Sequence, residues 1–222
     1  AVAVVKSSLQ LLLLRQRSAA EYEAGLTQCL VDIERLEELV SQMLTMARVE
    51  AAGRPALAGA TALTPCVERT IAQLTSFAQL RCVQIRASLD AAADLAVPLD
   101  VEDCLTLVSN LILNALQHSP ADSLIEVRVT PEAEGLRFSV ADHGEGIDPE
   151  TLPHVFERFY RGDASRSRAT GGSGLGLAIC KALVDRAGGV IALANNAGSG
   201  ATAMVWLPAC PAASREPAAV ST

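Results

Sequence analysis

The sequence predicts an α+β protein in which a helical hairpin, half of a dimeric four-helix bundle, precedes an α/β sandwich. The sandwich is expected to have a mixed sheet covered by helices on one face. Residues 1–50 contain no proline and a single glycine, Gly25, while their apolar residues recur at helical spacing. Helix-like and strand-like stretches then alternate, which suits a sheet packed against one layer of helices. With 222 residues, 50% of them hydrophobic, the chain is able to bury a core, so general disorder is excluded.

Charge and hydropathy exclude two classes of partner. A net charge of −7 and only 3% aromatic residues argue against a nucleic-acid surface. The longest apolar stretch, residues 1–14, is interrupted by Lys6 and Gln10 and falls short of the ~18 apolar residues of a membrane span. We therefore expect a soluble chain without membrane contact, whose partners are small ligands or proteins. It opens inside an apolar pattern without a capping residue, which indicates a segment of a longer protein.

The hairpin occupies residues 1–50. Ser18 followed by Glu21 predicts a capping box, so a second helix should begin near Ala19, the first having ended around residues 15–17. Two interleaved seven-residue series predict an a/d seam: Leu26, Ile33, Val40 and Ala47, with Cys29, Leu36 and Met43. One hairpin cannot cover so long a seam, which favours a homodimer. The alternative is that the seam packs on the rest of its own chain.

The elements of the second domain follow from local signals. Gly53, Pro55 and Gly59 mark residues 51–60 as a linker. Thr64 and Pro65 predict an N-cap and first-turn proline. The expected elements are a helix to about residue 80, strands at 82–89 and 95–99, a helix from Asp100 to His118, strands at 124–129 and 136–141, a helix at 174–187, and strands at 190–194 and 202–207. The second domain is thus expected to cover residues 61–208, with a disordered tail over 209–222.

Six cysteines are scattered without metal-ligand spacing, and several fall in apolar runs. We interpret them as reduced core thiols.

Twelve of the fifteen glycines lie between Gly135 and Gly200, so the backbone there approaches something closely. A first cluster, residues 142–147 (DHGEGI), places a carboxylate and two glycines directly after a strand. This suits recognition of a ligand amine, although an ordinary turn explains it equally well. A second cluster, residues 171–177 (GGSGLGL), opens a helix, where free N–H groups favour phosphate. Between the clusters, residues 157–170 hold four arginines that suit a loop closing over phosphates.

A third element is the amide pair Asn110 and Asn114. Residues four apart share one face of a helix, and amide oxygens are ligands for magnesium carried in with a nucleotide. A pair of structural hydrogen bonds is the alternative reading.

Taken together, these motifs stand in a specific order. Asn110 to Asn114, 142–147, 154–163 (HVFERFYRGD), 171–177 and 198–202 (GSGAT) resemble the N, G1, F, G2 and G3 boxes of the ATP-binding domain of sensor histidine kinases, within the fold family shared with gyrase, Hsp90 and MutL. The hairpin, ending in LTMARVE, is similar to the dimerisation and histidine-phosphotransfer domain. The resemblance covers residues 1–208.

The resemblance implies ATP and Mg²⁺ as cofactors. Asn114 would bind the magnesium that bridges the phosphates, with Asn110 assisting, and Asp142 would accept a hydrogen bond from the adenine amino group. Arg158 would be the third catalytic residue with the two asparagines. The other expected ATP contacts are Gln117, His118, Gly144, Gly146, Ile147, Phe156, Phe159, Tyr160, Arg161, Gly172, Ser173, Gly174, Leu175, Gly176, Leu177 and Thr202.

Several positions depart from the family pattern. Gln117 stands where a lysine or arginine is common, so a lid arginine would neutralise the phosphates, while His118 replaces a tyrosine that stacks on adenine. In the last box Ala201 occupies the usual threonine position, and Thr202 would take its role. Gyrase-like ATPases resemble one another in a water-activating glutamate four residues before the magnesium asparagine, where this chain has Asn110. Without that base, ATP should be held for an external nucleophile.

That nucleophile would be a histidine on the first helix, yet no histidine precedes His118. His143 and His154 also fall within ATP-domain motifs. The resemblance therefore implies the cytoplasmic catalytic fragment of a sensor histidine kinase of the bacterial inner membrane, with a response-regulator receiver domain as partner. We expect Mg-ATP binding and a homodimer without autophosphorylation. The alternatives are a degenerate nucleotide-binding scaffold, or a gyrase-type ATPase or serine kinase of the same fold.

Overall fold

The computed structural model describes residues 2–51, 60–90, 95–160 and 173–210. The chain divides into two compact units, Ala1–Arg48 and Val49–Thr222. In the described ranges, no helix combines the length and the low charge that crossing a membrane requires.

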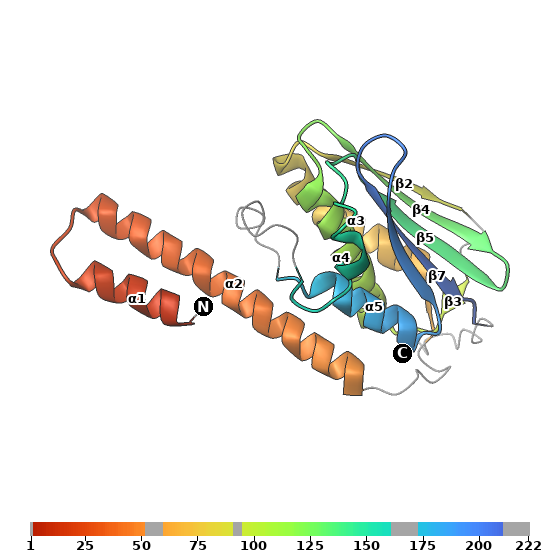
Figure 1. Cartoon of the computed structure of the whole chain (residues 1–222), viewed down its shortest axis with the longest axis horizontal. Helices are drawn as coiled ribbons and strands as arrows, with labels where there is room; N and C mark the ends of the chain where they lie inside the picture. Colours follow the sequence, from red (N-terminus) through yellow and green to blue (C-terminus); the bar gives the residue numbers. More distant parts are fainter. Residues whose placement is uncertain (1, 52–59, 91–94, 161–172, 211–222) are drawn as a thin grey trace, which may run out of the picture. The chain divides into compact units, whose positions relative to one another are not determined.

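The first unit is the predicted hairpin, made of α1 (Val2–Leu13) and the first part of α2 (Ala19–Ala51) (Figure 1). The capping box is confirmed: the Ser18 backbone N–H donates to Glu21 Oε2 at 2.8 Å, and the Glu21 N–H donates to Ser18 Oγ at 3.3 Å. The bond from the Ser18 N–H is the main cause that lowers the pKa of Glu21. The two helices approach closely at Gly25, where a Cβ would lie 2.4 Å from Leu12 Cδ2.

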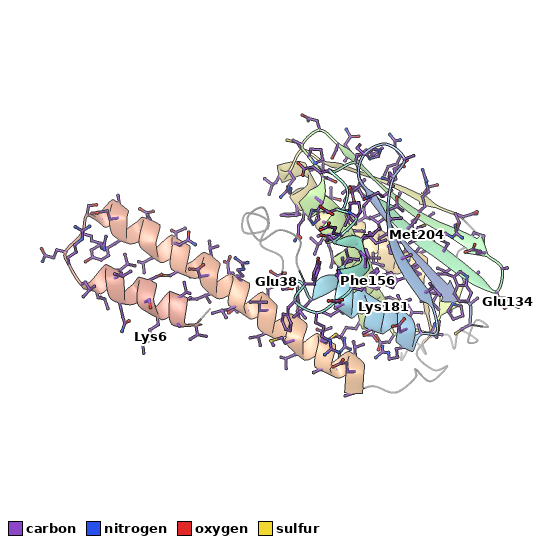
Figure 2. The ribbon with its side chains drawn as sticks, in the orientation of Figure 1. Lys6, Glu38, Glu134, Phe156, Lys181 and Met204 are labelled. Carbon is purple, nitrogen blue, oxygen red and sulfur yellow. The ribbon has the colours of Figure 1, made fainter. Side chains whose placement is uncertain are left out.

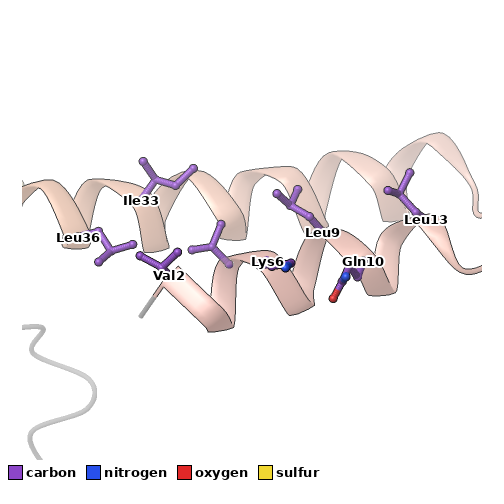
Figure 3. A pocket seen from close by; sticks show the side chains of 8 residues that line it. Val2, Lys6, Leu9, Gln10, Leu13, Ile33 and Leu36 are labelled. Carbon is purple, nitrogen blue, oxygen red and sulfur yellow. The ribbon is translucent and has the colours of Figure 1, made fainter.

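Much of the hairpin's apolar surface is uncovered. A groove of about 380 Å³ runs between α1 and α2, with Val2, Leu9 and Ile33 among its lining residues (Figure 3). Part of the predicted seam is accessible as well: Leu26 is 51%, Val40 53% and Met43 52% exposed, whereas Cys29 is buried and Leu36 half-buried. An apolar surface this continuous is unusual for a free monomeric protein.

The second unit contains a five-stranded mixed sheet with strand order β2-β4-β5-β7-β6. Its strands are β2 (Gln84–Leu89), β4 (Leu124–Glu132), β5 (Gly135–Ala141), β6 (Val190–Asn195) and β7 (Ala201–Pro208). The β2–β4 pair is parallel and the other pairs are antiparallel. A second, two-stranded sheet pairs β1 (Thr61–Ala62) with β3 (Ala96–Val97).

Three helices cover one face of the large sheet, as predicted: α3 (Leu63–Leu80), α4 (Val101–His118) and α5 (Gly176–Arg186) (Figure 1). Strand alternation selects the side chains that meet them. In β7, Ala203 and Val205 are buried, whereas Met204 lies on the face away from the helices (Figure 2). Fully buried Phe138 on β5 and Leu107 on α4 belong to the resulting core.

The start of α3 differs from the prediction. Thr64 does not cap this helix, because the N-cap residue is Ala62, which makes no side-chain capping bond. Strand β1 runs directly into the helix and is held by its pairing with β3, so no polar cap is needed to orient the first turn. By contrast, the predicted start of α4 at Asp100 is confirmed: Asp100 is the N-cap, and its Oδ1 accepts from the Asp103 N–H at 2.8 Å.

The ends of two predicted segments also differ. Helix α2 continues to Ala51, and the rest of the expected linker, residues 52–59, lies outside the described residues. At the other end, Ala209 N–H donates to Glu134 O at 2.9 Å and Cys210 N–H donates to Ala96 O at 2.7 Å. These bonds hold residues 209 and 210, the first two of the expected tail, against the edges of the domain. Residues 211–222 are not described.

All six cysteines are free, and five are buried, as expected of core thiols. Cys82 is the exception, since it is exposed at a left-handed position, φ 54°, in the turn between α3 and β2.

Candidate functional site

Three parts of the second unit meet near the amide pair of α4. The segment 142–147, which follows β5, packs against the C-terminal end of α4, and the first turn of α5 packs against its middle. The contacts are tight: a Cβ on Gly144 would lie 2.3 Å from His118 O, and a Cβ on Gly176 would lie 3.5 Å from Asn110 Oδ1. This arrangement brings together motifs that are up to 66 residues apart in the sequence.

The amide pair lies on α4. Asn110 and Asn114 are both half-buried and share one face of this helix, beside the buried side chain of Leu111. Within the described part of the chain, the side chain of Asn114 makes no hydrogen bond. A half-buried amide without a protein partner is suited to a ligand or a hard cation. This arrangement disfavours the alternative that the Asn114 amide makes a structural hydrogen bond.

Asn110 is positioned by a cysteine that the sequence analysis did not select. Cys180 on α5 is fully buried, its thiol donates to Leu107 O at 3.8 Å, and its sulfur is hydrogen-bonded to the Asn110 side chain. Burial raises the pKa of the Cys180 thiol to about 12, so the group is neutral at physiological pH and keeps its proton for Leu107 O. A cysteine inside an apolar run gives no sequence signal for such a role.

Asp142 stands at the end of β5 and is only 7% exposed. Its Oδ1 accepts from the backbone N–H groups of Gly144 at 2.9 Å and Ala201 at 3.2 Å. No donor among the described residues reaches its other oxygen, Oδ2. The carboxylate is thus fixed by one oxygen and has the second available, an arrangement that suits recognition of an amine on a ligand.

The glycines around Asp142 serve the protein's own packing. Gly200 has φ +82°, and a Cβ there would lie 2.1 Å from Asp142 O, while Gly144 faces His118 O. We expected Gly144 to let a ligand approach, but the approach of the chain to itself already requires glycine at this position.

Two asparagines at the end of β6, also not selected from the sequence, hold the same segment. Asn195 Oδ1 accepts from the Ile147 N–H and its Nδ2 donates to Ile147 O, both at 2.7 Å. Asn196 Nδ2 donates to Asp142 O at 2.9 Å, and its Oδ1 accepts from Thr202 Oγ1 at 2.6 Å. Thr202 therefore connects to Asp142 through Asn196. The only sequence signal was the Asn-Asn pair before a glycine-containing turn.

A backbone hydrogen bond joins the described residues on either side of positions 161–172. Phe159 N–H donates to Gly174 O at 2.9 Å, and both residues have positive φ, 60° and 74°. Ser173 Oγ accepts from the Leu175 N–H at 3.1 Å at the start of α5. The expected lid arginine, Arg161, and Gly172 lie outside the described residues, whereas Phe156 and Tyr160 belong to the described segment that follows β5 in the sequence.

The remaining predicted residues occupy different environments. Gln117 is half-buried and His118 is exposed, both in the last turn of α4. Arg158 is exposed. Leu175 is buried beneath the first turn of α5, so it packs in the core, whereas Gly146 and Leu177 are more accessible.

Comparison with known proteins gives a consistent result. Residues 99–211 match the family model described as histidine kinase-, DNA gyrase B-, and HSP90-like ATPase. The chain is 35% identical over 180 residues to the sensor-like histidine kinase SenX3 of Mycobacterium tuberculosis, an alignment that covers 81% of this chain and 43% of SenX3. The chain thus spans less than half the length of this curated relative.

Solved structures support the same fold. The mycobacterial sensor histidine kinase MprB is 27% identical with a TM-score of 0.57, over 68% of this chain and 97% of the MprB chain. Full-length ShkA in complex with AMPPNP is 23% identical with a TM-score of 0.70, over 90% of this chain and 41% of that one.

Proposed function

The chain belongs to the family of histidine kinase-, DNA gyrase B- and HSP90-like ATPases, and we propose that it binds Mg-ATP for phosphoryl transfer to a histidine and onward to a response-regulator aspartate. One observation carries the proposal: the fixed carboxylate of Asp142, the amide pair of α4 and the N-terminus of α5 converge on one site. These supply, in turn, an acceptor for an amine, oxygen ligands for a cation and N–H groups for phosphate.

In this proposal Asp142 recognises the adenine base. Its free Oδ2 accepts a hydrogen bond from the 6-amino group of adenine, while Oδ1 stays bound to Gly144 and Ala201. The exposed His118 ring, at the C-terminal end of α4, is close to this segment and stacks on the base. The AMPPNP bound to ShkA supports an adenine nucleotide as the ligand for this fold.

The donor set fits a magnesium ion that arrives with the nucleotide. Among the described residues no group of three or more His, Cys, Asp or Glu side chains is placed to hold a metal. The half-buried Asn114 amide instead offers one hard oxygen, and Mg²⁺ is commonly held by one or two protein oxygens together with phosphates and water. Bound there, the ion neutralises phosphate charge, and Asn110 orients the phosphates from the same face of α4.

The protein's part in transfer is positioning and charge compensation. The N–H groups at the start of α5 hold the phosphates, and the positive residues of the 157–170 loop, including Arg158 and Arg161, compensate their charge. Asn110 is unable to remove a proton from water, so hydrolysis is slow and the γ-phosphoryl group waits for an external nucleophile. Since no histidine precedes His118, this chain does not phosphorylate its own hairpin.

We propose a second copy of this chain as the occupant of the exposed hairpin face. Among the uncovered seam residues, Leu26, Ile33 and Val40 recur every seven residues, and Met43 belongs to the second seven-residue series. This spacing is typical of a four-helix bundle. In the complete protein, this region is expected on the cytoplasmic side of the bacterial inner membrane.

A titration with a fluorescent ATP analogue, with and without Mg²⁺, tests the proposal. Asp142→Asn replaces the acceptor Oδ2 by a donor and leaves Oδ1 in place, so the dissociation constant should rise at least about tenfold. Asn114→Leu should abolish the effect of Mg²⁺ on affinity. Asp148→Asn is the matched control, because Asp148 is an exposed aspartate of the same region whose Oδ1 accepts only the local Glu150 N–H.

Two results would contradict the proposal. If the wild-type chain binds no nucleotide, the scaffold alternative holds. If it hydrolyses ATP rapidly in steady state, the chain is an ATPase of the gyrase type, and Asn110 does not limit hydrolysis.

A further inference from the structure

The segment that carries Asp142 leaves the sheet immediately after its last paired residue. Ala141 pairs with Thr202 at the end of the β5–β7 ladder. Asp142 still donates its N–H to Ala201 O at 2.9 Å, but residues 143–147 have no strand partner in the described sheet. Backbone groups outside a ladder need other partners to hold one conformation. The partners of this segment include two side chains at the C-terminal end of β6, which lies beyond β7 in the sheet.

The side chain of Asn195 pairs with the backbone of Ile147 as a residue of an adjacent strand would. The backbone of Asn195 is fixed in the β6–β7 ladder opposite Ala201, and its side-chain amide bonds to both the N–H and the C=O of Ile147 at 2.7 Å. Paired residues of an antiparallel sheet exchange the same two bonds. An asparagine amide supplies both a donor and an acceptor, whereas aspartate supplies acceptors only.

Asn196 holds the other end of the segment. Its Nδ2 donates to Asp142 O at 2.9 Å and to Ser199 O at 3.1 Å, and its Oδ1 accepts from Thr202 Oγ1. Asp142 is therefore bound through its carbonyl by Asn196, and through its N–H and its Oδ1 by the backbone of Ala201. The rigid end of the sheet fixes both ends of residues 142–147.

We propose that Asn195 and Asn196 are positioning residues that set the Asp142 carboxylate for recognition of the 6-amino group of adenine. The inference rests on the proposed function, because it assumes that Asp142 Oδ2 contacts the base. Asn195 and Asn196 touch no nucleotide in this role, and they act through Ile147 and Asp142. Their loss therefore weakens selection of the amino group more than it weakens binding of the phosphates.

The experiment compares ATP with purine riboside triphosphate, which lacks the 6-amino group, by calorimetry in the presence of Mg²⁺. In Asn195→Ala and in Asn196→Ala, ATP affinity should fall about tenfold while affinity for the purine analogue changes less than about twofold. Asn195→Asp should behave like Asn195→Ala, because it places a carboxylate oxygen against Ile147 O. Ser199→Ala is the control: it alters the same turn but leaves the Ser199 carbonyl in place.

Amide hydrogen exchange supplies a second readout. Exchange at Gly144 and Ile147 should accelerate in both alanine variants, with β4 unchanged. Equal losses for the two nucleotides, accompanied by a parallel fall in Tm, would reduce the asparagines to a structural role and overturn the inference, as would unchanged affinities. Failure of the wild-type chain to bind either nucleotide would instead refute the proposed function, and the inference with it.

Discussion

Among the described residues, most large apolar side chains of the second unit are buried, although a few such as Leu80 are exposed, whereas many of those in the hairpin face solvent. Phe138 and Leu107 are 0% exposed, while Leu44 is 66% and Leu26 51% exposed. The second unit closes its core with its own sheet and three helices, and two antiparallel helices offer no second layer. This difference motivates the proposed homodimer, in which a second copy would cover the exposed apolar face of the hairpin.

The largest expected effect tests the closed core. Phe138→Ala should lower the free energy of unfolding by about 3–5 kcal/mol, because it removes a fully buried ring and leaves a cavity. Leu80→Ala is the control, since Leu80 is 84% exposed and its truncation should change stability by less than about 0.5 kcal/mol. Urea unfolding measures both. Similar losses in the two variants would erase the contrast between buried and exposed apolar residues.

The next effect tests the open face of the hairpin. Glutamates at Ile33 and Val40, which are 38% and 53% exposed, should raise the dimer dissociation constant at least about 100-fold, because a dimer would bury these charges. Light scattering after size exclusion measures the oligomeric state. Glu34→Gln with Glu37→Gln is the matched control on exposed positions of the same helix. A dimer that survives the glutamates would mean that another surface associates.

A smaller effect tests whether the buried Cys180 of the second unit supports the candidate site or contributes only to packing. Cys180→Val keeps the volume but loses the hydrogen bonds to Leu107 O and Asn110. We expect the affinity for Mg-ATP to fall about threefold, with affinity for metal-free ATP unchanged. Cys180→Ser should restore part of the loss. Equal effects with and without Mg²⁺ would assign Cys180 to packing alone.

The smallest effect concerns the exposed start of α2. Ser18 lowers the pKa of Glu21 below its ordinary value of 4.5, so the ionised carboxylate stabilises the helix start above that pH. This contribution is lost as the pH falls from about 4.5 through the lowered pKa of the folded state. Hydrogen exchange should show less protection of the first turn of α2 under acid, and Ser18→Ala should weaken this pH dependence, because it removes the hydroxyl bond to Glu21 and leaves the bond from the backbone N–H. Ser41→Ala, in the middle of the same helix, should not.

Local patterns predicted most of the fold. The capping box at Ser18 and the helix start at Asp100 are signals of a few residues, and both are present as expected. The start of α3 was predicted incorrectly, because the pairing of β1 with β3 across about 35 residues replaced a local cap. The same reason applies to residues 209 and 210, whose backbone partners, Glu134 and Ala96, are far away in the sequence.

The candidate site divides in the same way. The motifs with Asn114 and Asp142 were found from the sequence because spacing on a helix and position after a strand are local properties. Asn195, Asn196 and Cys180 were missed, since their partners lie 48, 54 and 70 residues away.

The sequence by itself determined the two-part organisation, the order of the elements and the candidate residues for nucleotide binding, because periodicity, caps and motif spacing are properties of short segments. Only the tertiary structure decided which oxygen of Asp142 is free, why Gly144 and Gly200 must be glycine, and which side chains hold residues 142–147. These properties depend on close approach between segments far apart in the chain. Hydrogen bonds and steric contact act over a few ångströms, and only folding brings such segments that close.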